Sequence, residues 1–177
     1  MNTAEQKSVF RLGAECGLPM GCYLSVMSVA SVFADRLPML GLVVMVMLFA
    51  TPLVIWYFQR RYWRESEGMA EYSAMWMLGI LTMIYGALIT GLVTWCVVEW
   101  GRPDFLYDQL QNAIDAYRKM PELKNNEILD VMQKAIDTNA LPSTIEMVSN
   151  MFWLTAFGGS LVSAVTAAFA RIGRVKY

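Results

Sequence analysis

Four long apolar stretches dominate the hydrophobic pattern of the chain. They cover Leu12–Ala34, Leu37–Phe58, Ser73–Val98 and Thr144–Ala170. Each is longer than the ~20 residues that a helix needs to cross a hydrocarbon core. Backbone in lipid must satisfy its own hydrogen bonds, and no stretch alternates as a barrel strand does, so helices are expected. The pattern predicts an all-α integral membrane protein, with four transmembrane helices in a single membrane domain over residues 1–177.

The segment between the third and fourth stretches, residues 99–143, has a different pattern. Apolar side chains recur there every three or four residues in two runs, the period of a helix with one apolar face. Proline stands near the start of the first run and at its end, at Pro103 and Pro121. We expect an extracytoplasmic amphipathic helix hairpin whose apolar face rests on the membrane surface, the mouth of the bundle or a partner. Ser143 and Glu146 form the pattern of a capping box at the start of the fourth helix. The two apolar runs are Phe105, Leu106, Leu110, Ala113, Ile114, Tyr117 and Met120, and then Ile128, Leu129, Met132, Ala135 and Ile136.

Composition supports a membrane location and argues against several kinds of function. Apolar residues make up 56% of the chain and charged residues 16%, against about 25% charged in an average protein. The net charge of −1 gives no basic field for nucleic acid. The chain has no histidine, the commonest general base and metal ligand. Cys16, Cys22 and Cys96 lie inside predicted spans without metal-binding spacing, so we interpret them as apolar filler and expect no metal and no cofactor.

Basic residues indicate the orientation. They gather before the first span, after the second and after the fourth, and are sparse near the other span ends. The positive-inside rule then places both termini in the cytoplasm. Contact with lipid phosphate is a second interpretation of the arginines after the second span, although topology alone accounts for them. The basic residues on the cytoplasmic side are Lys7, Arg11, Arg60, Arg61, Arg64, Arg171, Arg174 and Lys176.

Small residues recur every four positions in the first and fourth spans. Such ladders let two helices approach closely in lipid, where burial of apolar surface gives no driving force. We favour packing within this chain, and contact with a partner or a second copy stays open. The residues are Gly13, Gly17, Gly21 and Ser25 in the first span, and Gly159, Ser163 and Ala167 in the fourth.

One carboxylate, Glu15, falls well inside a predicted span. An intramembrane carboxylate is a candidate ion or proton site. Arg11 precedes it by four residues on the same helical face, so an ion pair near the cytoplasmic end is the favoured interpretation.

A group of charged residues is expected at the outer interface, where the first span ends and the insert begins. Within the group, Asp104 and Asp108 are spaced by four and suit a divalent cation. A solvated polar face explains the group equally well. Its members are Asp35, Arg36, Glu99, Arg102, Asp104 and Asp108.

Three short motifs carry a resemblance to a known family. They are Arg61-Tyr62-Trp63-Arg64, the following Glu67-Gly68-Met69-Ala70-Glu71-Tyr72, and Arg102-Pro103-Asp104-Phe105 at the start of the insert. With four spans, this set resembles a family of small inner-membrane proteins from Bacteroidota, the domain of unknown function four-one-nine-nine. The resemblance implies an inner-membrane location and an association with a polyprenyl-phosphate glycosyltransferase. It implies no activity and no functional residues.

No phosphate-binding loop, nucleophile motif or metal-spaced set of ligands is present in the sequence. We therefore expect a protein that is not an enzyme: a small membrane subunit that packs with or regulates a larger inner-membrane protein, such as that glycosyltransferase. Its expected partners are membrane lipids and another inner-membrane protein or a second copy, and nucleic acid is not among them. Two alternatives stay open, an oligomeric small transporter or channel that uses Glu15, and an interfacial lipid-phosphate enzyme that uses Asp104 and Asp108.

Overall fold

The computed structural model describes residues 9–119, 126–137 and 142–172, and within these ranges every regular element is a helix. The helices are α1 (Val9–Phe33), α2 (Pro38–Glu65), α3 (Tyr72–Cys96), a π-helical turn η1 (Val97–Gly101), α4 (Phe105–Lys119), α5 (Asn126–Asp137) and α6 (Thr144–Ala170).

Four of these helices are long and apolar enough to cross a membrane: α1, α2, α3 with its continuation η1, and α6. The prediction of four such helices is confirmed. The second helix is longer than the sequence pattern indicated, because it continues beyond Phe58 to Glu65. Arg60, Arg61 and Arg64 therefore stand on the last turns of α2 and not in a loop. An ion pair between Arg61 and Glu65, with 2.7 Å between Nε and Oε1, supports this extra length.

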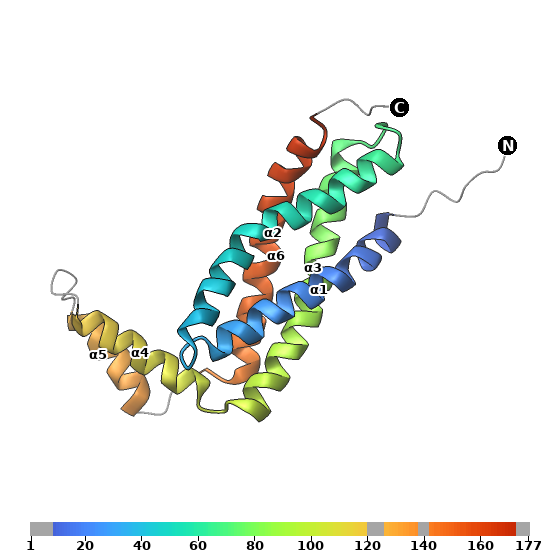
Figure 1. The fold of residues 1–177 in the computed structure, drawn as a ribbon. Coiled ribbons are helices and arrows are strands. Elements are labelled where there is room, and N and C mark those ends of the chain that lie inside the picture. Colours follow the sequence, from blue (N-terminus) through green and yellow to red (C-terminus); the bar gives the residue numbers. More distant parts are fainter. Residues whose placement is uncertain (1–8, 120–125, 138–141, 173–177) are drawn as a thin grey trace.

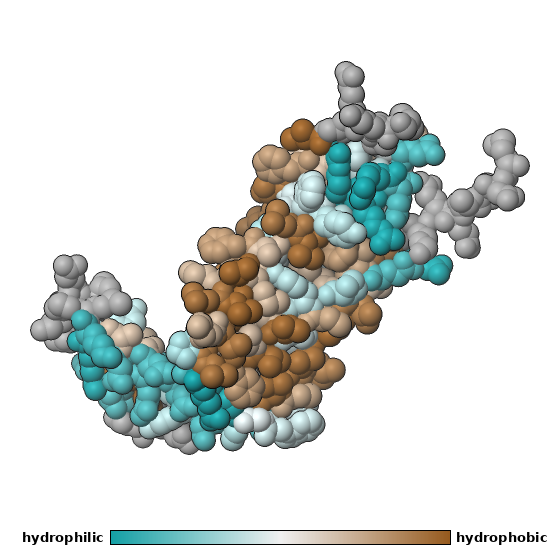
Figure 2. All heavy atoms as spheres, in the orientation of Figure 1, coloured by the Kyte–Doolittle hydropathy of each residue, from teal (hydrophilic) through white to brown (hydrophobic). Residues whose placement is uncertain are grey.

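Helix α3 lies between α1 and α6, and α2 packs against α6 and α1 (Figure 1). One end of the bundle holds the α1–α2 connection and the start of α4, and we call it the α4 end. The other end holds the start of α1, the end of α6 and the α2–α3 connection, and we call it the terminal end. Hydrophobic atoms cover the middle of the bundle, whereas hydrophilic atoms gather at its ends and over α4 and α5 (Figure 2).

The glycines of α1 are where that helix meets α3. A Cβ atom added at Gly13 would lie 2.7 Å from Cβ of Leu81, and one added at Gly21 would lie 2.8 Å from Cβ of Ile89. A real side chain does not fit at these distances, so the two backbones approach as closely as they do because these positions carry none. Ser25 continues the same face and is buried. The facing pairs are Gly13 with Leu81, Gly17 with Tyr85, and Gly21 with Ile89.

The small residues of α6 meet the opposite face of α3. A Cβ atom added at Gly159 would lie 2.7 Å from Cγ of Met83. The hydroxyl of Ser163 donates to the carbonyl oxygen of Trp76 at 3.1 Å. Ala167 is fully buried beside Met75. Both ladders thus lie in contacts inside this chain.

Helices α4 and α5 pack against each other and project to one side of the α4 end (Figure 1). Ile114 is the buried residue of α4, and Leu129 and Met132 of α5 are half-buried. The predicted capping box is present where the chain re-enters the bundle. The backbone N–H of Ser143 donates to Oε2 of Glu146 at 2.9 Å, and that of Glu146 donates to the Ser143 hydroxyl at 3.4 Å.

Two adjacent glycines test the contact between α3 and α6. We expect Gly159→Ala to lower the free energy of unfolding by about 1–3 kcal/mol, because the added methyl group overpacks against Met83. Gly158 has no atom within 4 Å of an added Cβ. Gly158→Ala should therefore be neutral, or stabilise by about 0.5–1 kcal/mol through its helix preference. Thermal unfolding in detergent measures both, and equal midpoints for the two variants would contradict the close approach.

Candidate functional site

Arg102 is the best-buried charged residue that the structure describes, with 5% of its surface exposed. It stands directly after η1, the π-helical turn that ends α3. Single π turns are frequently found at functional sites. A buried guanidinium is costly unless its charge is balanced and its N–H groups are bonded. Its partners therefore define a candidate site.

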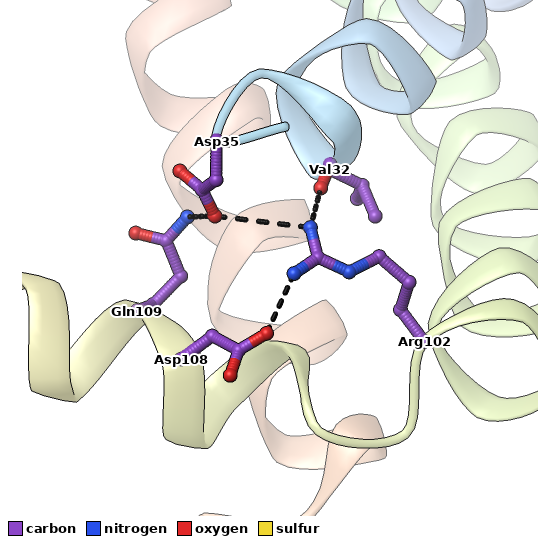
Figure 3. A network of polar contacts seen from close by, with 5 residues as sticks. All are labelled: Val32, Asp35, Arg102, Asp108 and Gln109. Atoms are coloured by element: carbon purple, nitrogen blue, oxygen red, sulfur yellow. Dashed lines mark hydrogen bonds and ion pairs between the residues drawn. The ribbon is translucent and has the colours of Figure 1, made fainter. Parts of the chain in front are cut away.

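The guanidinium connects three helices, and Figure 3 shows it pointing between the end of α1 and the start of α4. Its Nη1 donates to the carbonyl oxygen of Val32 at 2.5 Å and lies 3.7 Å from Oδ2 of Asp35. Its Nη2 donates to Oδ2 of Asp108 at 2.6 Å. The side chain of Gln109 donates to Oδ2 of Asp35 at 3.0 Å. We call these five residues the Arg102 cluster.

Each contact of the cluster has a distinct physical role. Val32 belongs to the last turn of α1, where carbonyl groups lack helical partners and the helix dipole favours a cation. Asp35 and Asp108 supply the opposite charge, and both are partly open to solvent. The ring of Phe105 lies 5.6 Å from the guanidinium carbon and covers its face. Together they hold the start of α4 against the end of α1.

Only some of the charged residues expected together at the outer interface contact one another in the structure. Asp35, Arg102 and Asp108 meet, whereas Arg36, Glu99 and Asp104 are exposed and lie outside the cluster.

The same geometry bears on cation binding. Asp108 directs its carboxylate to Arg102, so it is not poised with Asp104 around a cation. Among the described residues, no group of three or more cysteine or carboxylate side chains is placed to hold a metal ion.

A second polar site lies toward the terminal end and involves Gln59, which is fully buried. Its Nε2 donates to both oxygens of Ser163 at 3.0 Å and lies 3.3 Å from the Met75 carbonyl oxygen. Its Oε1 is buried and has no hydrogen-bond partner among the described atoms. Gly79 makes room for this contact, because a Cβ there would overlap the Ser163 hydroxyl. Gln59 thus joins α2 to α3 and α6.

The remaining candidate residues mostly have partners in the chain. Nε of Arg11 lies 3.3 Å from Oε1 of Glu15, and both side chains are exposed. Arg60 donates to the carbonyl oxygens of Ala170 at 2.5 Å and Ile172 at 3.1 Å, which closes the end of α6. Arg64 is exposed on the last turn of α2.

Sequence reasoning missed Gln59, Gln109 and the Val32 carbonyl. A glutamine inside an apolar helix is a signal for Gln59, because an amide in hydrocarbon needs partners. Gln109 follows Asp108 on an exposed helix and carries no such signal. The Val32 carbonyl is a backbone group, and whether it can accept a hydrogen bond from a side chain depends on where α1 ends.

Fold and site define a helical protein with four apolar helices of membrane-spanning length and a helix pair fixed by a buried arginine. Comparison with known families identifies the family to which the chain belongs. The chain matches the family described as "Protein of unknown function (DUF4199)" over residues 15–171, and it belongs to that family. No curated protein and no solved structure matches it.

Removal of the buried guanidinium should loosen α4. We expect Arg102→Leu to lower the free energy of unfolding by about 2–3 kcal/mol, because Asp108 and the Val32 carbonyl lose their charged donor. Arg36→Leu is the matched control, since Arg36 is exposed next to Asp35 in the α1–α2 connection. Hydrogen exchange of α4 amides should accelerate in Arg102→Leu alone. Equal exchange in the two variants would show that the cluster does not hold α4.

Proposed function

We propose that this protein is a non-catalytic subunit of the bacterial inner membrane that packs with and regulates a larger membrane protein. In this proposal α1, α2, α3 and α6 span the bilayer, both termini are cytoplasmic, and α4 and α5 are extracytoplasmic. The basic residues at the terminal end support this orientation. The family resemblance indicates a polyprenyl-phosphate glycosyltransferase as the larger protein.

The observation that carries the proposal is the exposure of α2. From Pro38 to Val54 this helix has no buried residue, although it belongs to a bundle of four. A helix that packs only within its own chain normally buries one stripe along its whole length. This half of α2 therefore presents a complete surface to lipid or to another membrane protein. Its most exposed large side chains are Met39, Leu42, Val46, Phe49 and Leu53.

Contacts elsewhere in the chain favour α2 over the other helices as the docking surface. The glycine face of α1 lies against α3, and the small residues of α6 lie against the other side of α3. The helix-packing faces of α1 and α6 are thus occupied by this chain. From Pro38 to Val54, α2 buries no residue, although the Tyr23 hydroxyl of α1 donates to the Met47 carbonyl oxygen there.

Charge pairing favours a subunit over the transporter or channel alternative. Glu15 pairs with Arg11 near the terminal end, and the interior amide of Gln59 bonds to Ser163. A transport pathway needs polar groups that exchange their partners with the substrate. Glu15 instead pairs with Arg11 one turn away on α1, and Gln59 joins α2 to α6.

Photocrosslinking in living cells tests the docking surface. A photoreactive residue at Val46 should capture one larger membrane protein, identified by mass spectrometry, whereas the same residue at Leu161 of α6 should not. The two positions are matched in exposure, at 68% and 73%. Phe49→Ala should lower the yield about tenfold, as expected for the loss of an aromatic hot spot.

Phe169→Ala on α6 is the control for that substitution, because Phe169 is also exposed. It should leave the yield unchanged. Equal capture from Val46 and Leu161, or capture of lipid alone, would contradict a subunit that docks through α2.

A further inference from the structure

Three arginines lie on the last turns of α2, and two of them are bonded within the chain. Arg60 donates to two carbonyl oxygens at the end of α6, at 2.5 and 3.1 Å. Arg61 pairs with Glu65, with 2.7 Å between Nε and Oε1. Arg64 is exposed, and its side chain has no ion pair or hydrogen bond among the described residues. The guanidinium group of Arg64 is therefore free to bind a ligand.

A fourth arginine, Arg171, comes directly after α6 and is also exposed. Its guanidinium carbon lies 5.7 Å from the centre of the Trp63 ring, a cation–π contact that holds it against α2. Arg60 and Arg64 are one helical turn apart on the same face of α2, and Arg60 bonds to the carbonyl groups on either side of Arg171. Arg64 and Arg171 thus lie at one corner of the terminal end, and we call them the arginine pair.

The helix ends at this corner do not repel an anion as free helix C-termini would. Carbonyl groups at a C-terminus carry partial negative charge. At the end of α6 these groups accept from the Arg60 guanidinium. At the end of α2 they accept from backbone N–H groups of the next turn, including that of Gly68 to the Trp63 carbonyl oxygen at 3.0 Å. The positive charge of the arginine pair is therefore not offset by an open helix end.

The carboxylates that follow Arg64 along the chain also leave the arginine pair free. Glu65 is paired within α2. Glu71 accepts a hydrogen bond from the side chain of Ser73 at 3.2 Å. Glu67 is exposed in the α2–α3 connection. Within the part of the chain that the structure describes, none of the three forms an ion pair with either arginine.

Aromatic side chains surround the same corner. Tyr62, Trp63 and Tyr72 pack against a small cluster that includes Ala167 and Ala170, in the last turns of α6. Tyrosine and tryptophan are enriched where the hydrocarbon of a membrane meets the lipid headgroups. The proposed function places the terminal end at the cytoplasmic face. The arginine pair then lies at the level of the lipid phosphates.

We propose that Arg64 and Arg171 bind the phosphate group of an anionic phospholipid, such as phosphatidylglycerol, at the cytoplasmic face of the membrane. A guanidinium group donates parallel hydrogen bonds that match the geometry of phosphate oxygens. A phosphatidylcholine headgroup carries its own cation, so two arginines without carboxylate partners favour a lipid with net negative charge. This inference rests on the membrane placement in the proposed function and not on the partner at α2.

Native mass spectrometry tests the site. The full-length protein in detergent is titrated with phosphatidylglycerol and, separately, with phosphatidylcholine. One molecule of phosphatidylglycerol should bind about tenfold more tightly than phosphatidylcholine. Arg64→Gln and Arg171→Gln should each weaken phosphatidylglycerol binding about tenfold, as expected for the loss of a hydrogen bond between charged groups. An equal concentration of inorganic phosphate should not displace the lipid.

Arg61→Gln is the matched control. It removes the same charge from the same part of α2, but Arg61 lies on the side that faces Leu12 and Glu15 of α1. Phosphatidylglycerol affinity should not change in this variant. Thermal unfolding checks that the variants are folded. If Arg171→Gln is not, Arg64→Gln decides alone, because the Arg64 side chain is exposed and unbonded among the described residues.

Three results would each overturn the lipid site. They are equal weakening by Arg61→Gln and Arg64→Gln, equal affinity for the two lipids, and displacement of phosphatidylglycerol by inorganic phosphate. None of them changes the photocrosslinking expected from Val46, so the subunit proposal stands or fails separately.

Discussion

Many large apolar side chains of the four long helices are exposed, and this constraint governs the rest of the structure. Phe49, Leu154 and Leu161 each leave more than 70% of their surface exposed, and α2 buries only Ile55 and Gln59. Such a surface suits hydrocarbon as its surroundings, which is the membrane placement that we propose. Burial of apolar area then gives little reason for two helices to associate, and close backbone contact and internal hydrogen bonds must hold the bundle together.

Close backbone contacts and internal hydrogen bonds occur in different parts of the bundle. Glycines of α1 and small residues of α6 bring both helices close to α3 along its length. Polar bonds then fasten the two ends. Gln59 and Arg60 join α2 to α6 toward the terminal end, and Arg102 joins α1, α3 and α4 at the other end. Between these two ends, α2 buries no residue from Pro38 to Val54.

This division also leaves the outward side of α2 as the surface that we assign to a partner. It is suited to a partner helix, because it is broad and continuous. The Arg102 cluster fixes where α4 begins relative to α1. It thereby sets the direction in which α4 and α5 project.

Sequence patterning predicted the helices well, because length, apolarity and capping are local properties. The four long helices, α4, α5 and the capping box at Ser143 all follow from such signals. The hydrophobic pattern alone placed the end of α2 too early, at Phe58, because the charged Arg60, Arg61 and Arg64 indicated a loop. In the structure α2 continues to Glu65: Gln59 and Arg60 bond to α6, and Arg61 pairs with Glu65.

The candidate site was only partly predictable. Charge and position near span ends indicated Asp35, Arg102 and Asp108, but could not separate them from Arg36, Glu99 and Asp104. That separation depends on the π-helical turn η1, which directs Arg102 inward.

The central claim is that lipid surrounds the bundle, with α4 and α5 on its outer side. Cysteine accessibility tests it most directly. After replacement of Cys16, Cys22 and Cys96 by alanine, a single cysteine is introduced at Gln111 on α4 or at Met69 between α2 and α3, both exposed. A membrane-impermeant maleimide applied to intact spheroplasts should label the Gln111→Cys protein at once, and the Met69→Cys protein only after the membrane is opened. Equal labelling of both positions in intact spheroplasts, or recovery of the protein in the aqueous fraction without detergent, would contradict the account.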